Sequence, residues 1–208
     1  QAAGMPSQPG FHLPDHLQPV SSMAADALDL SEAIPDARLA PKEALAEGYQ
    51  QALRRHGDKL LGKGDPRGNL SLRENLARFL RISRGLVAKS ENFFISSGTS
   101  ITLRLLTATL LPEGGHIAVE DPGNPVVWET LRSLPGIHMH PVPVNSGGMD
   151  MEALIALLNR QPLDLLYLTP QYQIPTTSVL APERRTQLLA LAREHDFAII
   201  EDDPYSEY

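Results

Sequence analysis

From Asn92 onward, short apolar runs alternate with stretches in which apolar residues recur at helical spacing. The short runs are expected to form strands: 92–96, 116–120, 137–142, 164–169 and 197–201. The stretches between them are expected to form helices: 101–111, 126–134, 151–158 and 183–195. Such alternation is typical of crossover units, so it predicts an α/β fold with a mainly parallel sheet and helices on both faces.

The part of the chain before Asn92 shows a different pattern. Residues 1–37 carry five prolines among polar residues without sustained periodicity, and are expected to form an extended arm or an interdomain linker. Pro41 stands at a helix-start position before residues 43–56, and the spacing of apolar residues in 72–80 predicts a second helix. Residues 38–208 are therefore expected to form most of one large domain.

Composition excludes several classes of function. The formal charge is -7, from 18 Lys and Arg against 25 Asp and Glu, and no basic cluster suggests a nucleic-acid surface. The absence of Cys excludes a disulfide and a thiolate metal site. No signal segment and no apolar run of membrane-spanning length is visible. We expect a cytoplasmic protein without a membrane partner.

Two loops at the expected strand ends carry candidate chemistry, because ligands of such folds collect beyond the carboxyl ends of the strands. The turn Ser97-Gly98-Thr99 opens a helix, whose free N–H groups can bind a phosphate; an ordinary helix cap is the alternative. Asp202 and Tyr205 follow the last strand and present a carboxylate and a phenol, although a solvated acidic loop or a hard-metal site has the same composition.

A metal site elsewhere has little support from the sequence. His138 and His140 share one face of an expected strand and could bind a metal ion, but no third ligand is in view. We therefore expect no metal.

The order and spacing of five motifs resemble the fold type I pyridoxal-phosphate (PLP) aminotransferases, from about Asp29 to the end of the chain. The motifs are a glycine loop with Leu-Arg on the next helix, Ser-Gly-Thr, Glu-Asp-Pro-Gly, Thr-Pro-x-x-Gln-x-Pro-Thr, and Glu-Asp-Asp-Pro-Tyr. They lie at 62–73, 97–99, 120–123, 169–176 and 201–205. The resemblance implies PLP as the cofactor and an amino acid or an amine as the substrate or effector.

Within this family, details at 64–68, 83–86, 184–185 and 206–208 are similar to the MocR-type regulators. In these regulators a linker joins a GntR-like winged helix to an aminotransferase-like domain, so DNA would be bound only through a domain outside this chain, and residues 1–37 would be the end of the linker. A free-standing aminotransferase of the aminoadipate type shares most of the motifs. A degenerate structural or dimerisation module without cofactor is a third possibility.

The resemblance also implies roles for single residues. Gly98, Thr99 and Ser100 would hold the PLP phosphate through backbone N–H and hydroxyl groups, Asp202 would pair with the pyridine nitrogen, and Tyr205 would bind the phenolic oxygen of the ring. Asn124, which stands where the family usually has a stacking aromatic, and Gln173 are expected at the same site.

Four positions depart from the usual pattern of the family. Asn124 replaces the stacking aromatic, Ile174 an Asn, Lys63 a Tyr that contacts the phosphate in the partner subunit, and Thr177 a Gly. These changes put ordinary transamination in doubt but leave the phosphate-binding turn and Asp202 in place. The resemblance further implies a homodimer.

The lysine that would form a Schiff base with PLP is not found in this chain. The lysines are Lys42, Lys59, Lys63 and Lys89, and all lie upstream of the candidate loops. Because the chain opens on Gln1 and ends at Tyr208, we expect it to be part of a longer polypeptide, cut before that lysine and before the small domain. Alone it is expected to be inactive.

Overall fold

The structure is a computed structural model, and it describes residues 37–205 of the chain. These residues form two compact units, divided between Gly62 and Lys63. The expected arm lies outside the described residues except for Ala37, so the domain boundary after residue 37 stays a prediction.

The described residues of the first unit, 37–62, form mainly one helix. A short 3-10 helix, η2 (Ala37–Leu39), precedes α1 (Lys42–Leu61), and α1 begins directly after Pro41 as predicted. At His56 the backbone leaves helical geometry, with φ -140° and ψ 19°. Leu45 and Tyr49, four residues apart on one helix face, are 63% and 71% exposed. This helix therefore carries an exposed apolar stripe.

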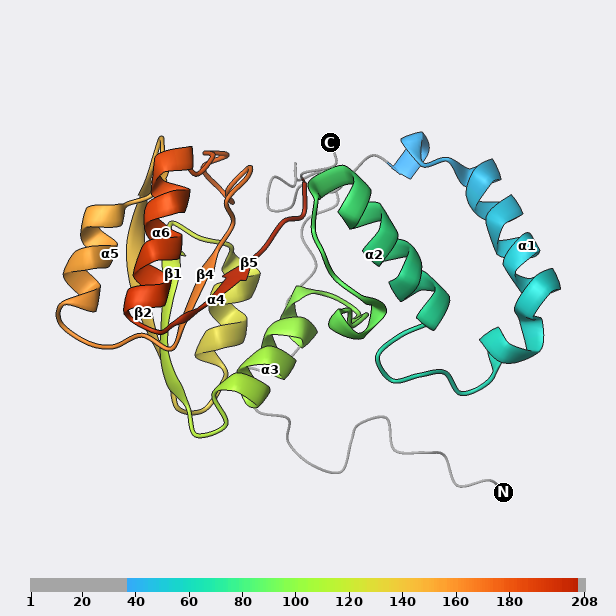
Figure 1. Ribbon diagram of the computed structural model, residues 1–208, viewed down its shortest axis with the longest axis horizontal. Helices are drawn as coiled ribbons and strands as arrows, with labels where there is room; N and C mark the ends of the chain where they lie inside the picture. Colours follow the sequence, from blue (N-terminus) through green and yellow to red (C-terminus); the bar gives the residue numbers. More distant parts are fainter. Residues whose placement is uncertain (1–36, 206–208) are drawn as a thin grey trace, which may run out of the picture. The chain divides into compact units, whose positions relative to one another are not determined.

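The second unit is a sheet with helices, as predicted (Figure 1). Its elements are α2 (Leu70–Arg84), η3 (Ser90–Asn92), α3 (Thr99–Leu110), β1 (Gly115–Asp121), α4 (Pro125–Arg132), β2 (Ile137–Asn145), β3 (Gly148–Met149), α5 (Met151–Leu158), β4 (Leu165–Leu168), α6 (Pro182–Glu194) and β5 (Ala198–Glu201). The strand order is β3-β2-β1-β4-β5, and all pairs are parallel except β2 with β3. The mainly parallel sheet is thus confirmed.

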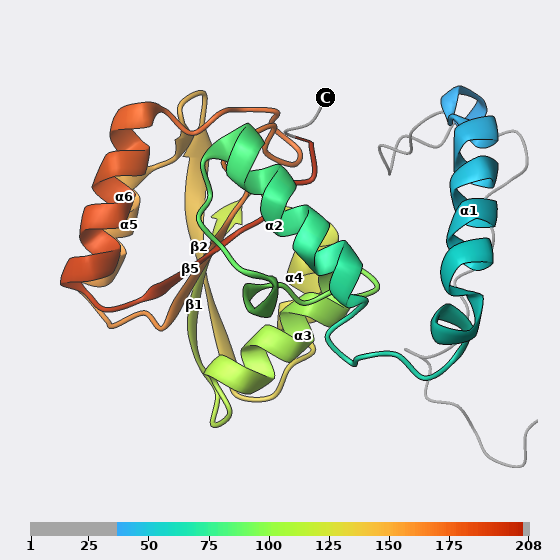
Figure 2. The ribbon, with the colours of Figure 1, turned by 45° about the vertical axis from the view of Figure 1, so that its right-hand side comes forward.

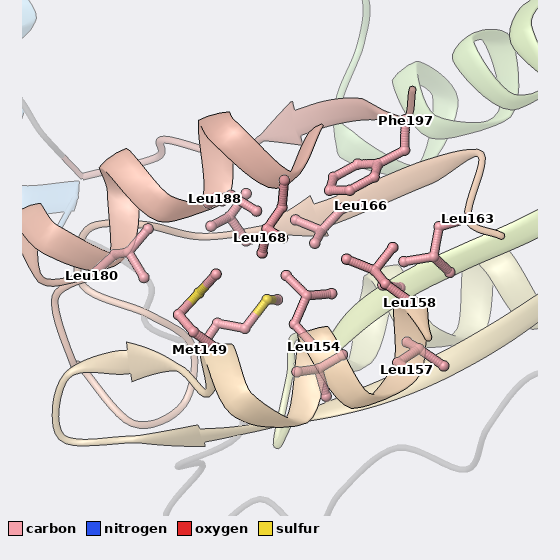
Figure 3. Close-up of a cluster of buried hydrophobic side chains, with 14 residues drawn as sticks. Met149, Leu154, Leu157, Leu158, Leu163, Leu166, Leu168, Leu180, Leu188 and Phe197 are labelled. Carbon is pink, nitrogen blue, oxygen red and sulfur yellow. The ribbon is translucent and has the colours of Figure 1, made fainter. Parts of the chain in front are cut away.

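Helices cover both faces of this sheet because side chains alternate along each strand (Figure 2). On one face, Ala118 and Leu166 belong to a core that includes Leu154 of α5 and Leu188 of α6 (Figure 3). On the other face, strand residues with the opposite parity form a second core with α3 and α4; they are Ile117, Val119, Leu165 and Tyr167. In the described part of the chain, no helix is long and apolar enough to cross a membrane.

One expected strand is wrong. Residues 90–92 form η3, and residues 93–96 lie outside the sheet. The backbone N–H of Ile95 donates instead to the carbonyl of Arg67 at 2.9 Å, and its side chain lies so close to Gly68 that an added Cβ there would collide with it. The apolar run packs on the glycine loop, a partner that periodicity cannot reveal. Strand β3 was not expected, because two residues carry no period.

Candidate functional site

A cavity of about 260 Å³ opens where the sheet meets the start of α3. Its lining residues come from α3 and its preceding loop and from the carboxyl ends of β4 and β5: Ser96, Gly98, Thr99, Thr102, Leu103, Tyr167, Ile200, Glu201 and Asp202. The structure thus brings Gly98, Thr99 and Asp202 together. Asp202 follows β5, where ligands of parallel sheets are expected, whereas Gly98 and Thr99 follow a loop instead of the expected strand.

The start of α3 offers backbone donors to this cavity. Gly98 precedes the helix with φ 140°, a conformation that side chains disfavour, and no side chain caps the helix. The hydroxyl of Thr102 donates to the carbonyl of Gly98 at 3.0 Å and lies 2.5 Å from the hydroxyl of Ser96. The first N–H groups of a helix lack partners within the helix, so this turn can bind an anion.

Ser100 differs in part from the expectation. Its hydroxyl accepts a hydrogen bond of 3.0 Å from the hydroxyl of Thr130 on α4. The side chain therefore ties α3 to α4, and Ser100 can serve an anion through its backbone N–H.

Asp202 is held at the rim by two hydrogen bonds. Its backbone N–H donates to the carbonyl of Leu168 at 2.9 Å, which continues the pairing of β5 with β4. The hydroxyl of Tyr167 donates to Oδ2 of the carboxylate. Burial, together with the nearby carboxylate of Asp202, raises the pKa of Tyr167, so this hydroxyl stays a donor. The second oxygen, Oδ1, can meet another donor.

Asn124 and Gln173 lie in structural positions outside the cavity lining. The side chain of Asn124 accepts from the N–H of Val126 at 3.0 Å and caps α4. Gln173 is 1% exposed, and its amide donates to the carbonyl of Pro122 at 2.8 Å. Tyr205 is half-buried and is not among the residues that line the cavity. The cofactor contacts expected of these three residues stay predictions.

Glu120, at the end of β1, is a buried acid that the sequence motif did not single out for chemistry. It is 3% exposed, and its Oε2 accepts from the backbone N–H of Thr169 at 3.0 Å. Burial raises the pKa of Glu120 to about 7; this hydrogen bond opposes the shift and the charge of Asp202 adds to it. Part of Glu120 is thus protonated near neutral pH.

Two further contacts were missed by sequence reasoning. Tyr167 could have been suspected, because a Tyr in an apolar buried strand needs a partner for its hydroxyl. The ion pair between Arg84 at the end of α2 and Asp203 joins segments 119 residues apart, and no local pattern signals it. It anchors the loop that carries Asp202 to α2.

One of the four departures from the usual motif has a visible backbone consequence. Thr177 has φ 57°, a left-handed conformation that a Gly adopts at no steric cost and a β-branched residue disfavours. Its N–H donates to the carbonyl of Gln173 at 2.6 Å, which closes the turn. The loop therefore keeps the shape that a Gly would favour, although a Thr occupies the position.

The chain is similar to known proteins over most of its length. The family model of aminotransferase class I and II matches residues 25–208. The HTH-type transcriptional regulator YhdI of Bacillus subtilis is 34% identical, over 97% of this chain and 43% of YhdI. The probable rhizopine catabolism regulatory protein MocR of Rhizobium meliloti is 29% identical, over 99% of this chain and 41% of that protein. The chain thus spans less than half the length of these curated relatives.

A solved structure shows the same family resemblance in three dimensions. The crystal structure of LysN, the α-aminoadipate aminotransferase of Thermus thermophilus complexed with N-(5'-phosphopyridoxyl)-L-leucine, matches with a TM-score of 0.76 and 30% sequence identity. The match covers 85% of this chain and 43% of LysN.

Proposed function

The chain belongs to the class I and II aminotransferase family, and on that premise we propose that it forms the front part of a PLP-binding domain that senses an amino acid or an amine in a MocR-type transcriptional regulator. The observation that carries this proposal is the shared cavity: the uncapped start of α3 and the carboxylate of Asp202 open onto the same space.

The residues of the cavity fit PLP in their donor set. The N–H groups of Thr99 and Ser100 would hold the phosphate, with the hydroxyl of Thr99 beside them. Asp202 would accept a hydrogen bond from the protonated ring nitrogen, and Tyr205 would bind the phenolic oxygen. When bound, PLP supplies an electron-withdrawing ring that weakens the bonds at the Cα of an amino acid.

Tyr167 and Asp202 have a defined part in this arrangement. The hydroxyl of Tyr167 fixes the carboxylate of Asp202 through Oδ2. A fixed carboxylate would keep the pyridine nitrogen of bound PLP protonated, because an opposite charge at hydrogen-bond distance favours the charged form. The ion pair of Arg84 with Asp203 holds the same loop from the side of α2.

The regulator is favoured by two observations. Relatives that match almost the whole chain are named as regulators. In addition, Asn124 caps a helix where the family usually places the aromatic that stacks on the ring, so this site would hold PLP with fewer contacts. DNA would be bound by a winged-helix domain elsewhere in the polypeptide, and the protein would act in the cytoplasm.

We also propose a homodimer. The apolar stripe of α1, with Leu45 and Tyr49 largely exposed, offers a surface for a second subunit.

A free-standing aminotransferase is the second candidate. It is favoured by the similarity to LysN, whose crystal structure contains a phosphopyridoxyl compound. The two candidates differ in what the complete protein does with the same cavity: the regulator converts occupancy into a change of DNA affinity, and the enzyme into turnover.

The experiment uses the full-length protein and the DNA upstream of its own gene. For a regulator, PLP with an amino acid or an amine should change DNA affinity by about tenfold, within the usual range of coupling between sites, and Asp202→Asn should abolish the response. Steady transamination between an amino acid and a 2-oxo acid, without DNA binding, would favour the enzyme. Neither DNA binding nor turnover, with no PLP bound, would contradict both.

A further inference from the structure

A second cavity, of about 190 Å³, is lined by α6 and by the carboxyl ends of β4 and β5. Its wall is mainly apolar and includes Leu168, Leu180, Leu188 and Ile199. The three leucines belong to the core under α5 and α6 (Figure 3), whereas Tyr167 at the cavity of Asp202 belongs to the core on the other face of the sheet. The two cavities therefore lie on opposite faces of the sheet.

Two opposite charges line this second cavity together with the apolar wall. Arg185 lies near the start of α6, and Leu188, three residues further along the chain, shares its helix face. Glu201 ends β5 and also lines the cavity of Asp202. Within residues 37–205, the side chains of Arg185 and Glu201 form no ion pair or hydrogen bond with each other or with a third group. Both charges are therefore free to meet a ligand.

Arg184, the neighbour of Arg185, shows what a structural arginine does at this place. Its Nη1 donates to Oδ1 of Asn145 at 2.8 Å, and to the carbonyls of Gly148 and Met149 at 2.9 and 2.8 Å. These bonds tie the start of α6 to the turn between β2 and β3. Arg185 has no such acceptors, although it is half-buried beside an apolar wall. A guanidinium in this setting is suited to a carboxylate, which its planar fork of N–H donors matches.

We propose that this cavity binds a free α-amino acid with an aliphatic side chain, its carboxylate on Arg185, its ammonium group on Glu201 and its side chain on the apolar wall. Because the two protein charges cancel, they favour a ligand with one charge of each sign. Pockets for drug-sized ligands measure about 300–1,000 Å³, so a cavity of about 190 Å³ restricts the ligand to a smaller molecule. The site is separate from the proposed cofactor site and needs no PLP.

The test measures the binding of L-leucine to the full-length protein by titration calorimetry, without added PLP. Arg185→Gln should weaken this binding at least about tenfold, because it removes a hydrogen bond between two charged groups. Arg193→Gln changes an exposed arginine in the last turn of the same helix, and as the matched control it should leave the affinity unchanged. Asp202→Asn should also leave it unchanged, because Asp202 lines only the other cavity.

The roles of the two charges are separated by 4-methylpentanoate, which is L-leucine without its ammonium group. Arg185→Gln should weaken the binding of both molecules. Glu201→Gln should weaken the binding of L-leucine about tenfold and should not weaken that of 4-methylpentanoate, because only the ammonium group meets Glu201. Thermal unfolding of each variant checks that it is folded.

Three results would overturn the proposal. The first is the absence of L-leucine binding to the folded wild type at about 10 mM. The second is an equal loss of affinity in Arg185→Gln and Asp202→Asn, which would place the ligand in the cavity of Asp202. The third is an equal loss for both ligands in Glu201→Gln, which would contradict the placement of the ammonium group. PLP is absent from these titrations, so they succeed or fail independently of the proposed function.

Discussion

Asp202 provides the charge of the proposed cofactor site, and Tyr167 holds it in place. The variant Asp202→Asn keeps the shape of the side chain but removes its negative charge. A hydrogen bond to a charged group contributes about 1.5–3 kcal/mol, so we expect PLP to bind about 10–100-fold more weakly to the full-length variant, measured by equilibrium titration. The control is Asp196→Asn, an exposed position with φ 54°, which Asn tolerates. An equal loss of PLP affinity in both variants would contradict the assignment of Asp202 to the cofactor site.

Glu120 makes the stability of the protein depend on pH. The pKa of its carboxyl is near the ordinary value of 4.5 in the unfolded chain and about 7 in the folded one. Its stabilising contribution is complete below pH 4.5 and is lost as the pH rises through 7, because the unfolded chain then releases a proton that the folded chain keeps. Relative to Glu120→Gln, the wild type should lose up to about 3 kcal/mol of unfolding free energy between pH 4.5 and pH 8. Urea unfolding of both proteins at the two pH values measures the unfolding free energies. An equal change of unfolding free energy with pH in the wild type and the variant would contradict the prediction.

At the residue scale, the sequence predicted which backbone segments form the rim of the cavity better than it predicted the directions of the side chains there. Gly98, Thr99 and Asp202 meet at one cavity. Asp202 was correctly expected there because it follows a parallel strand, but Gly98 and Thr99 reach it although the run before them is not a strand of the sheet. The directions of side chains could not be predicted. The hydroxyl of Ser100 binds Thr130, and Tyr167 reaches Asp202, through tertiary contacts that a sequence motif does not encode.

The first turn of α3 is the element that would bind the phosphate, and Gly98 sets its direction. An added Cβ at Gly98 meets nothing within 4 Å, so Gly98→Ala acts through its backbone alone. A residue forced into such a conformation costs about 1–3 kcal/mol, or turns the loop away. We expect at least a tenfold loss of PLP affinity, measured by titration. Gly48→Ala, in the middle of α1 and equally free of contacts, should leave PLP binding unchanged and stabilise its helix by about 1 kcal/mol.

Long periodic elements are what the sequence predicted best. Helix α5 has the predicted bounds, and α6 begins at Pro182, one residue before the predicted start, because apolar spacing acts within the element itself. The strand predicted for residues 92–96 was wrong, because a short apolar run can pack on a loop as well as in a sheet.

At the scale of the whole molecule, the question is which lysine could react with PLP at the proposed site. Lys63 and Lys89 belong to the same unit as the cavity of Asp202 and are not among its lining residues. Lys42 and Lys59 belong to the other unit. After borohydride reduction of the full-length protein with PLP, peptide mass mapping should find no stoichiometric adduct on these four residues. A covalent link, if it forms, should map to a lysine outside residues 1–208. A specific adduct on Lys63 or Lys89 would mean that the site is built differently.

The central claim is that the start of α3 and Asp202 form two ends of one PLP site. A crystal structure of the full-length protein grown with PLP tests it most directly. The account predicts the phosphate at the N–H groups of Thr99 and Ser100, and the ring nitrogen at the carboxylate of Asp202. PLP bound elsewhere, or a ring nitrogen that meets a residue other than Asp202, would contradict it.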